Sequence, residues 1–152
     1  MARYIVRVRT PKSPAEAFSY MADLRNFAEW DPGVARVKQI DGDGAGLDAS
    51  FDVDVKVPGR PLTLRYRTTA FDDESTRMTA YAKSVMFSSE DVITVEADDE
   101  GTIVTYDAEL KLNGLLALWD PILKLSFNRI GDRAANGLIT ALAGERLPAL
   151  VG

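Results

Sequence analysis

The stretch from Ser13 to Trp30, SPAEAFSYMADLRNFAEW, predicts two short helices in succession, and the rest of the fold follows from it. Ser13 suits the N-cap position, Pro14 the first helical position and Glu16 the capping-box position. Apolar side chains then recur on one face as far as Leu24, which is typical of an amphipathic helix. We therefore expect the first helix to begin after Ser13 and to end near Leu24.

The second helix is predicted from Asn26 to Trp30, which is long enough for one further helical turn. The segment that follows, residues 31–33, reads Asp-Pro-Gly. A residue before proline avoids the helical region, and Pro-Gly favours a turn. The second helix should therefore end in a sharp corner.

A strand precedes the helices. Residues 3–9 alternate arginine with Tyr4, Val6 and Val8. This period of two indicates a strand with one buried face, and the arginines mark its solvated face.

Six further strands are predicted after the corner, because apolar and polar residues again alternate and acidic or glycine-containing turns separate the runs. They are Val34–Ile40, 51–57, Leu62–Phe71, Arg77–Lys83, Phe87–Glu96 and Thr102–Leu112. Connections of hairpin length favour an antiparallel arrangement. The expected sheet is therefore seven-stranded and antiparallel.

The chain ends in a long helix. Asp120 and Pro121 fit the N-cap and first helical positions, and the helical period continues to about Leu147. Glycine in a helix interior is unfavourable by about 1 kcal/mol relative to alanine. Close approach to another backbone would compensate at the three glycines of this segment, which are Gly131, Gly137 and Gly144.

Length and composition limit the classes of function. A chain of 152 residues fits one domain, residues 1–152, large enough for a sizeable core. The net charge of −5 and the lack of a clustered basic footprint argue against nucleic acid as a partner. The sequence contains no cysteine and no histidine, which excludes disulfides, thiolate nucleophiles, Ser-His pairs and the usual zinc sites. We expect no metal and no cofactor.

The N-terminal segment MARYIVRVRT alternates charged and apolar residues and does not resemble a signal peptide. The longest apolar run, residues 115–119, is far too short to span a bilayer. A cytoplasmic location without a transmembrane segment is therefore expected.

Three segments carry a resemblance to a known family. They are residues 13–30, the hairpin DVITVEADDEGTIVTYDAEL at 91–110, and DPILKLSFNRIGDRAANGL at 120–138. In this order and spacing they resemble the SRPBCC or START-like superfamily, the birch-pollen-allergen fold, and within it the bacterial single-domain polyketide cyclase/dehydrase proteins. The resemblance implies an α+β helix-grip fold, in which a curved antiparallel sheet wraps around a long C-terminal helix. It also implies that the two short helices close one end of the sheet.

A curved sheet and a long helix leave a cavity between them unless large side chains fill it. Parity along each element predicts which side chains face that cavity. The expected ligand-binding residues are Phe27, Trp30, Phe51, Val53, Val55, Leu64, Tyr66, Met78, Val104, Tyr106, Ala108, Leu110, Trp119, Leu123, Phe127 and Ile130. The expected wall is mainly apolar, as is usual for a small-molecule site.

Trp30 admits two roles, a packing anchor in the core or a contact with a bound ligand, and the two are compatible. Tyr66 and Tyr106 are polar candidates, since a buried phenol needs a hydrogen-bond partner. For Glu90 and Asp91 the residue type favours an exposed strand end. The alternative is a buried carboxylate with a raised pKa that acts as a base. No catalytic residue is assigned.

The segment around Asp120 is apolar on nearly every side, more than one sheet contact buries. It predicts either a lid over the cavity mouth or a homodimer contact, through Leu115, Leu118, Ile122 and Leu125.

Three functions fit the sequence. The first is binding or carriage of a hydrophobic small molecule, such as a lipid, a polyketide or another apolar metabolite, in the internal cavity. The second is a polyketide cyclase, aromatase or dehydratase that uses the same cavity and shapes a reactive chain with one or two polar groups. The third is a protein-interaction module like the START-like cochaperones, for which the outer surface matters.

Overall fold

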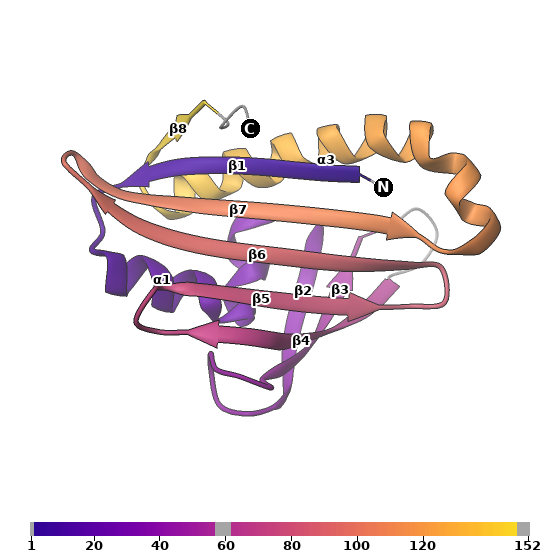
Figure 1. Ribbon diagram of the computed structural model, residues 1–152, viewed down its shortest axis with the longest axis horizontal. Coiled ribbons are helices and arrows are strands. Elements are labelled where there is room, and N and C mark those ends of the chain that lie inside the picture. Colours follow the sequence, from indigo (N-terminus) through magenta and orange to yellow (C-terminus); the bar gives the residue numbers. More distant parts are fainter. Residues whose placement is uncertain (1, 57–61, 149–152) are drawn as a thin grey trace.

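The structure is a computed structural model that describes residues 2–56 and 62–148. The described residues form one eight-stranded antiparallel sheet in the order β2-β3-β4-β5-β6-β7-β1-β8 (Figure 1). The strands are β1 (Ala2–Thr10), β2 (Val34–Asp41), β3 (Ser50–Val55), β4 (Leu62–Asp72), β5 (Arg77–Lys83), β6 (Phe87–Asp98), β7 (Gly101–Leu112) and β8 (Glu145–Leu147). The long central strands are paired by consecutive hairpins, and β1 closes against β7.

The helices follow the predicted order. They are α1 (Pro14–Ala22), η1 (Leu24–Asn26), α2 (Phe27–Trp30), η2 (Gly114–Trp119) and α3 (Asp120–Ala141). The Ser13 hydroxyl accepts a hydrogen bond from the Glu16 backbone N–H at 3.2 Å, as expected of an N-cap. The predicted helix-grip architecture is confirmed.

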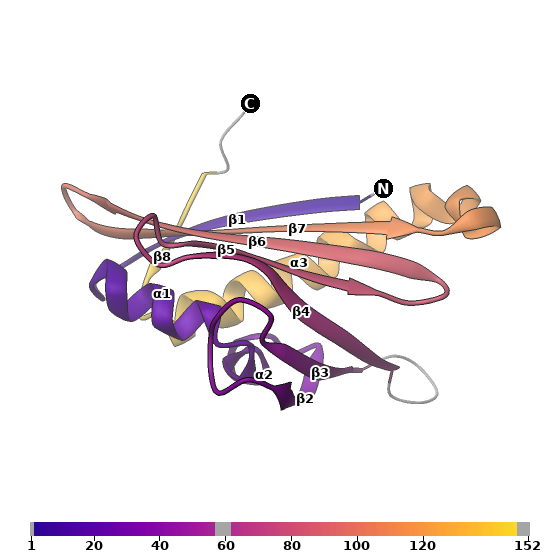
Figure 2. The same ribbon diagram turned by 60° about the horizontal axis from the view of Figure 1, so that its bottom comes forward.

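The sheet bends so that it faces α3 from two sides. Figure 2 shows α3 crossing below the long strands, with β2, β3 and α2 on the same side of these strands as α3. The ladder between β4 and β5 shifts register between Thr68 and Ala70, and the β2–β3 ladder shifts twice. Such irregularities increase local bending and twist, which carries β2 and β3 toward the helix.

The alternation predicted for the strands matches their burial. Every second residue of β1, from Ala2 to Thr10, is buried, and the same period recurs in β4 and β6. One core contains these inward side chains together with the apolar faces of α1, α2 and the C-terminal half of α3. The curved sheet therefore has one buried face and one solvated face.

The end of the long helix differs from the prediction. Helix α3 ends at Ala141, and Glu145–Leu147 form β8, which pairs with β1. A Cβ atom on Gly144 would lie 2.3 Å from the Arg9 carbonyl oxygen. The chain thus leaves the helix where it passes directly against β1. The predicted continuation to Leu147 is wrong, and an eighth strand replaces it.

The other two glycines make close approaches. A Cβ on Gly137 would lie 1.8 Å from the Trp30 carbonyl oxygen, so this glycine lets α3 touch the backbone of α2. A Cβ on Gly131 would lie 2.3 Å from the Tyr4 ring. Gly137 therefore makes the expected close contact with another backbone, whereas Gly131 packs against a side chain, the ring of Tyr4.

Candidate functional site

A cavity of about 170 Å³ lies between the sheet and α3. Its wall contains residues from α2 and the corner after it, from β2, β3, β4, β6 and β7, and from α3. The residues are Phe27, Asp31, Gly33, Val34, Val53, Val55, Leu64, Tyr66, Phe87, Ser89, Asp91, Tyr106, Ala108, Leu110, Phe127 and Ile130. The wall is apolar except for Asp31 and one group of hydrogen-bonded polar side chains.

Most of the residues predicted to face a cavity lie on this wall. They are Phe27, Val53, Val55, Leu64, Tyr66, Tyr106, Ala108, Leu110, Phe127 and Ile130. Phe51, Met78 and Val104 instead pack in the solid core and are essentially unexposed. Trp119 is 58% exposed at the surface, so its predicted inward position is wrong. The side chain of Leu123 lies outside the described residues.

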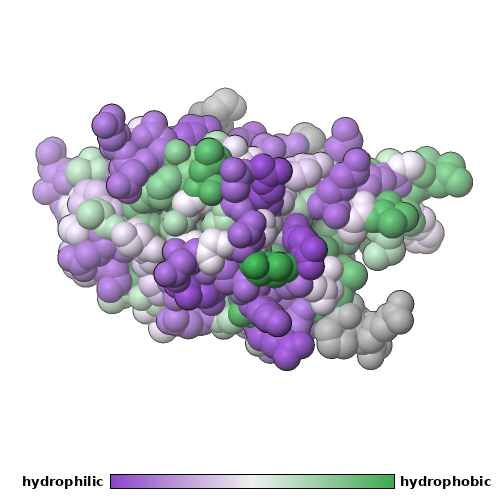
Figure 3. Space-filling view, turned by 90° about the horizontal axis from the view of Figure 1, so that it is seen from below, coloured by the Kyte–Doolittle hydropathy of each residue, from purple (hydrophilic) through white to green (hydrophobic). Residues whose placement is uncertain are grey.

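The mouth of the cavity lies where its wall is partly exposed. Ile130 of α3 is 50% exposed, and Phe87 and Leu110 are half-buried. Beyond the mouth, η2 and the first turns of α3 present Leu115, Leu118, Trp119, Ile122 and Leu125 to solvent. We call these five residues the apolar end. Figure 3 shows apolar side chains reaching the surface at this end of the molecule.

Phe27 and Trp30 close the inner side of the site. Their rings stack at 4.6 Å with an interplanar angle of 11°, and the edge of Tyr106 meets Trp30 at 5.2 Å. Trp30 is 3% exposed and borders a smaller void of about 50 Å³, which adjoins the main cavity through shared walls. Its place in an aromatic cluster gives Trp30 the contacts of a packing anchor.

The polar group arises from the period of β6. Phe87, Ser89, Asp91, Ile93 and Val95 alternate toward the interior. The cross-strand partners of Asp91 are small residues, Ala80 on β5 and Ala108 on β7. Since alanines leave space beside the carboxyl group, longer side chains from neighbouring strands can reach it.

Four buried side chains form a continuous hydrogen-bonded chain, which we call the polar chain: Tyr66, Ser89, Asp91 and Tyr106. The Tyr106 hydroxyl donates to Asp91 Oδ2 at 2.7 Å, and Ser89 Oγ donates to Asp91 Oδ1 at 3.3 Å. The Tyr66 hydroxyl donates to Ser89 Oγ at 3.0 Å. Tyr66 reaches across Ala82 of β5, which pairs with both Tyr66 and Ser89.

Burial controls the ionisation of this group. Loss of hydration raises the pKa of Asp91 to about 7, against the opposing effect of the hydrogen bonds from Tyr106 and Ser89. Burial also raises the pKa of both tyrosines, which therefore stay protonated. The pKa of Asp31 is raised by burial too, although the Gly33 N–H donates to its carboxylate at 2.8 Å.

The exposed position expected for Asp91 is wrong, whereas Glu90 is exposed as expected. Residue type favoured an exposed strand end, but the alternation shared with Ile93 and Val95 places Asp91 inside. The same alternation in the sequence would have identified Ser89 and Phe87. Asp31 and Gly33 carry no comparable signal, because the corner after α2 has no period.

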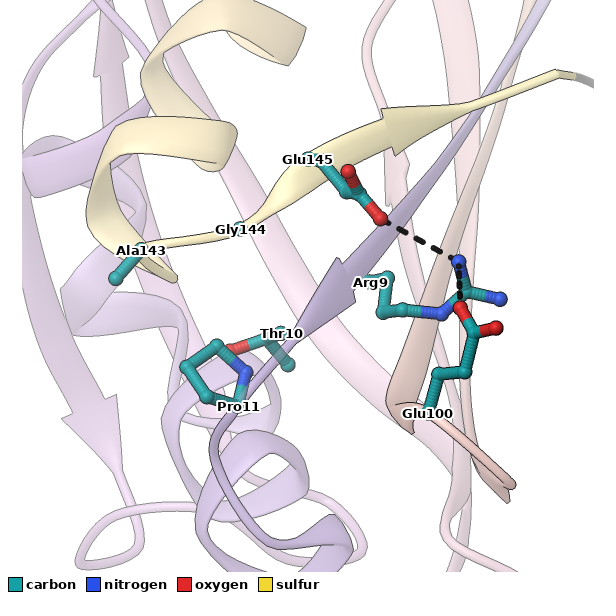
Figure 4. Close-up of a pocket in the computed structure, with 7 residues that line it drawn as sticks. All are labelled: Arg9, Thr10, Pro11, Glu100, Ala143, Gly144 and Glu145. Atoms are coloured by element: carbon teal, nitrogen blue, oxygen red, sulfur yellow. Dashed lines mark hydrogen bonds and ion pairs between the residues drawn. The ribbon is translucent and has the colours of Figure 1, made fainter.

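A second, larger depression of about 360 Å³ lies at the surface where β8 meets β1 (Figure 4). Arg9 crosses it and forms ion pairs with Asp98 at 2.7 Å, Glu100 at 3.3 Å and Glu145 at 3.4 Å. The three surrounding carboxylates neutralise the positive charge of this guanidinium, so it does not attract an anionic ligand. We assign the depression a structural role in joining β8 and the β6–β7 turn to β1.

Two further findings concern other kinds of site. Among the described residues, no group of three or more Asp, Glu, His or Cys side chains is arranged to hold a metal ion. Within the same residues, no helix has the length and apolar character needed to cross a membrane.

The chain also matches a known protein family in sequence. The model of the family described as "Polyketide cyclase / dehydrase and lipid transport" matches residues 1–144. The chain belongs to this family. No curated protein matches the chain in a sequence search.

Several solved structures have a fold similar to that of this chain. A START superfamily protein from Mycobacterium smegmatis is 13% identical with a TM-score of 0.74, and the match covers 94% of this chain and 98% of that one. A major latex-like protein from Panax ginseng is 12% identical with a TM-score of 0.67, covering 97% and 98%. The di-domain aromatase/cyclase BexL of the BE-7585A biosynthetic pathway is 13% identical with a TM-score of 0.64, covering 92% of this chain and 48% of BexL. At these identities the likeness concerns the fold alone.

Proposed function

We propose that this protein binds a hydrophobic small molecule in the cavity between the sheet and α3. The observation that carries the proposal is the wall itself, which combines apolar side chains from the buried face of the sheet, α2 and α3 with a few polar groups, the polar chain and Asp31. Ligand sites in proteins have this composition, with few polar groups that orient the bound molecule. Membership of a family described by lipid transport and polyketide cyclisation supports the same conclusion.

The volume limits the size of the ligand. Sites for drug-sized molecules occupy about 300–1,000 Å³, and an apolar cavity of about 150 Å³ holds benzene. At about 170 Å³ the cavity admits a compact one- or two-ring molecule, or one end of a longer molecule whose remainder leaves through the mouth beside Ile130. A complete lipid or polyketide chain therefore requires part of the ligand to lie along the apolar end.

Filling the cavity tests the proposal. Ala108 lies on the wall with its side chain inside, and Ala108→Phe places an aromatic ring in the ligand space. We expect native mass spectrometry and solvent extraction to recover an apolar molecule from the wild-type protein and not from this variant. Ala97→Phe is the matched control, because Ala97 is exposed on β6. Equal ligand content in wild type and Ala108→Phe would contradict the proposal.

A second function is favoured by the polar chain. A buried carboxyl with a pKa of about 7 is suited to transfer protons near neutral pH. We infer that Asp91 is the group that would act in a cyclase or dehydratase reaction of a ligand held beside it. The test is loss of water from an aryl β-hydroxyketone, followed by the ultraviolet absorbance of the enone. Turnover that persists in Asp91→Asn would remove this role.

A further inference from the structure

The polar chain is the deepest group of hydrogen-bonding side chains on a mainly apolar wall that also includes Asp31, and its donors and acceptors decide which ligand atom is recognised beside it. This inference rests on the proposed function, because it names the ligand group that the cavity selects. It is based on which partner each hydroxyl group of the polar chain donates its hydrogen to.

With Asp91 ionised, its carboxylate only accepts hydrogen bonds. Tyr106 and Ser89 must then both donate to it, at 2.7 and 3.3 Å, and Ser89 must accept from Tyr66 at 3.0 Å. Every hydroxyl hydrogen is used inside the chain. What remains for a ligand are lone pairs on the two tyrosine oxygens and on the Asp91 carboxylate, all of which accept a hydrogen bond and donate none.

With Asp91 protonated, the carboxyl group is itself a donor. It can donate to Tyr106, which frees the Tyr106 O–H, or to Ser89, which then donates to Tyr66 and frees the Tyr66 O–H. Either reversal turns one tyrosine hydrogen toward the cavity. The same four residues then donate a hydrogen bond to a ligand and satisfy an acceptor.

None of the groups that face Asp91 in the described part of the chain carries a positive charge, so the direction of the hydrogen bonds in the polar chain depends on whether Asp91 itself is protonated. Tyr66 of β4 and Tyr106 of β7 are held neutral by burial, and Asp31, at the corner after α2, is a second acid with a raised pKa. Beside Asp91, β5 contributes alanines, and the α3 side of the wall is Phe127 and Ile130. No cation appears among the described residues of the cavity wall.

One more acid acts on Asp91 from a distance. Asp107 follows Tyr106 on β7, on the opposite face of the strand, and pairs with Arg3 at 2.6 Å. Its charge is therefore largely matched outside the cavity. Asp31 is therefore the other acid beside Asp91 whose titration could change ligand binding, and an experiment must distinguish its effect from that of Asp91.

We propose that the polar chain recognises one oxygen atom of an apolar ligand: a ketone only when Asp91 is protonated, and an alcohol or phenol, whose hydroxyl group both donates and accepts, in either state of Asp91. An apolar ring or short chain occupies the rest of the cavity.

Three compounds with one skeleton test this proposal: indane, 2-indanol and 2-indanone. Their affinities for the full chain are measured by calorimetry at about pH 6 and about pH 8, on either side of the Asp91 pKa of about 7. The fraction of protein in the competent state changes about tenfold across this range. We expect 2-indanone to bind about tenfold more weakly at the higher pH, whereas 2-indanol, which can donate or accept, and indane should bind equally at both.

Variants assign the effect to Asp91. Asp91→Asn should bind all three compounds without the pH dependence of the ketone, whereas Glu90→Gln, the matched acid-to-amide control at the exposed neighbouring position of β6, should retain it. Asp31→Asn measures how much of that dependence comes from the second acid of the wall. The comparison of the three compounds at two pH values uses the wild-type protein. It therefore remains valid even if circular dichroism shows that Asp91→Asn is misfolded.

The two proposals fail in different ways. Binding of all three compounds with a common pH dependence overturns this inference and leaves the proposed function standing. Persistence of the ketone's pH dependence in folded Asp91→Asn overturns the role of Asp91. Failure of all three compounds to bind overturns the proposed function and this inference with it.

Discussion

At the scale of single residues, Asp91 is the position whose environment departs furthest from its residue type. A carboxyl group that is 3% exposed holds its proton to about pH 7, whereas the same group in the unfolded chain loses it near its usual value of 3.8. Between these values the unfolded state binds fewer protons than the folded state, so stability falls as pH rises. The difference of about three pKa units corresponds to a fall of about 4 kcal/mol, complete above about pH 7.

Urea unfolding between pH 4 and pH 8 tests this prediction. Asp91→Asn removes the titrating group, and we expect the free energy of unfolding of the variant to lose most of this fall. The comparison with wild type is needed because Asp31 acts in the same direction, while the lowered pKa values of Asp23, Asp54 and Asp98 act in the opposite one. An unchanged slope in Asp91→Asn would show that the carboxyl is hydrated.

Trp30 carries a second prediction at this scale. Its ring is buried between Phe27 and Tyr106, and replacement of a buried tryptophan by alanine lowers stability by about 3–5 kcal/mol. Trp30→Phe keeps an aromatic partner and should lose clearly less. Since Trp30 borders the small void, we expect Trp30→Phe to bind a cavity ligand nearly as well as wild type, measured by calorimetry. A large loss of affinity at unchanged stability would instead make Trp30 a ligand contact.

For single residues, the sequence predicted correctly which side chains face the interior where the alternation along a strand determines this. The inward parity of Tyr66 and Tyr106 followed from their strands. The prediction failed at Asp91, where the residue type was weighed above the alternation of Ser89, Asp91 and Ile93. The shorter of the two hydrogen bonds that make this burial tolerable comes from Tyr106 on β7, and the sequence of β6 alone does not contain it.

At the scale of elements, α3 depends on one close approach to α2. Alanine in place of a helical glycine normally raises stability by about 1 kcal/mol. At Gly137 we expect the opposite, because the added Cβ would lie 1.8 Å from the Trp30 carbonyl oxygen and the two helices must separate. Overpacking of this kind lowers stability by about 1–3 kcal/mol.

Chemical denaturation of Gly137→Ala measures that loss. Asn136→Ala is the control, since its neighbouring position on α3 is exposed and alanine there should be neutral or slightly stabilising. If Gly137→Ala were as stable as wild type, α2 and α3 would have to be separated by more space than the structure shows.

Element order was predictable, and element ends were less so. Caps, turns and alternation located the seven strands and the helices, because these signals are local. The residue at which α3 ends is determined by contacts with a distant part of the chain and not by local sequence signals. The sequence after Ala141 keeps helical residues, but β1 offers an unpaired edge, and Gly144 lets the chain pass against Arg9 to join it. Pairing with a distant strand therefore replaced two turns of helix.

At the scale of the whole molecule, the cavity arises because the two halves of α3 behave differently. Ala134, Ala135 and Leu138 are buried against the sheet and α2, whereas residues 121–126 are exposed wherever their side chains are described. The helix thus meets the sheet at one end and leaves a mouth at the other. Curvature and crossing angle, which depend on all elements together, set the volume of about 170 Å³, and the strand pattern alone predicted only that a gap would exist.

The apolar end gives the last prediction. Leu115 and Leu118 are 86% and 81% exposed, and Leu125 is 63% exposed, so several large apolar side chains at one end of the molecule are in contact with water. Patches of this kind mark interaction sites, and a two-fold contact between copies covers the same surface on both. We expect reversible homodimers at high concentration, favoured by added salt because the net charge of −5 on each copy is then screened.

Sedimentation velocity over a range of concentrations measures this association. Leu118→Asp should shift the protein to monomer, while Leu47→Asp should not, because Leu47 is 62% exposed in the β2–β3 connection, outside the apolar end. A wild-type protein that stays monomeric at every concentration and salt level would exclude the dimer. The apolar end would then be available to cover the mouth or to meet a different protein, and the same Leu118→Asp variant would report the first of these as altered ligand retention in the cavity.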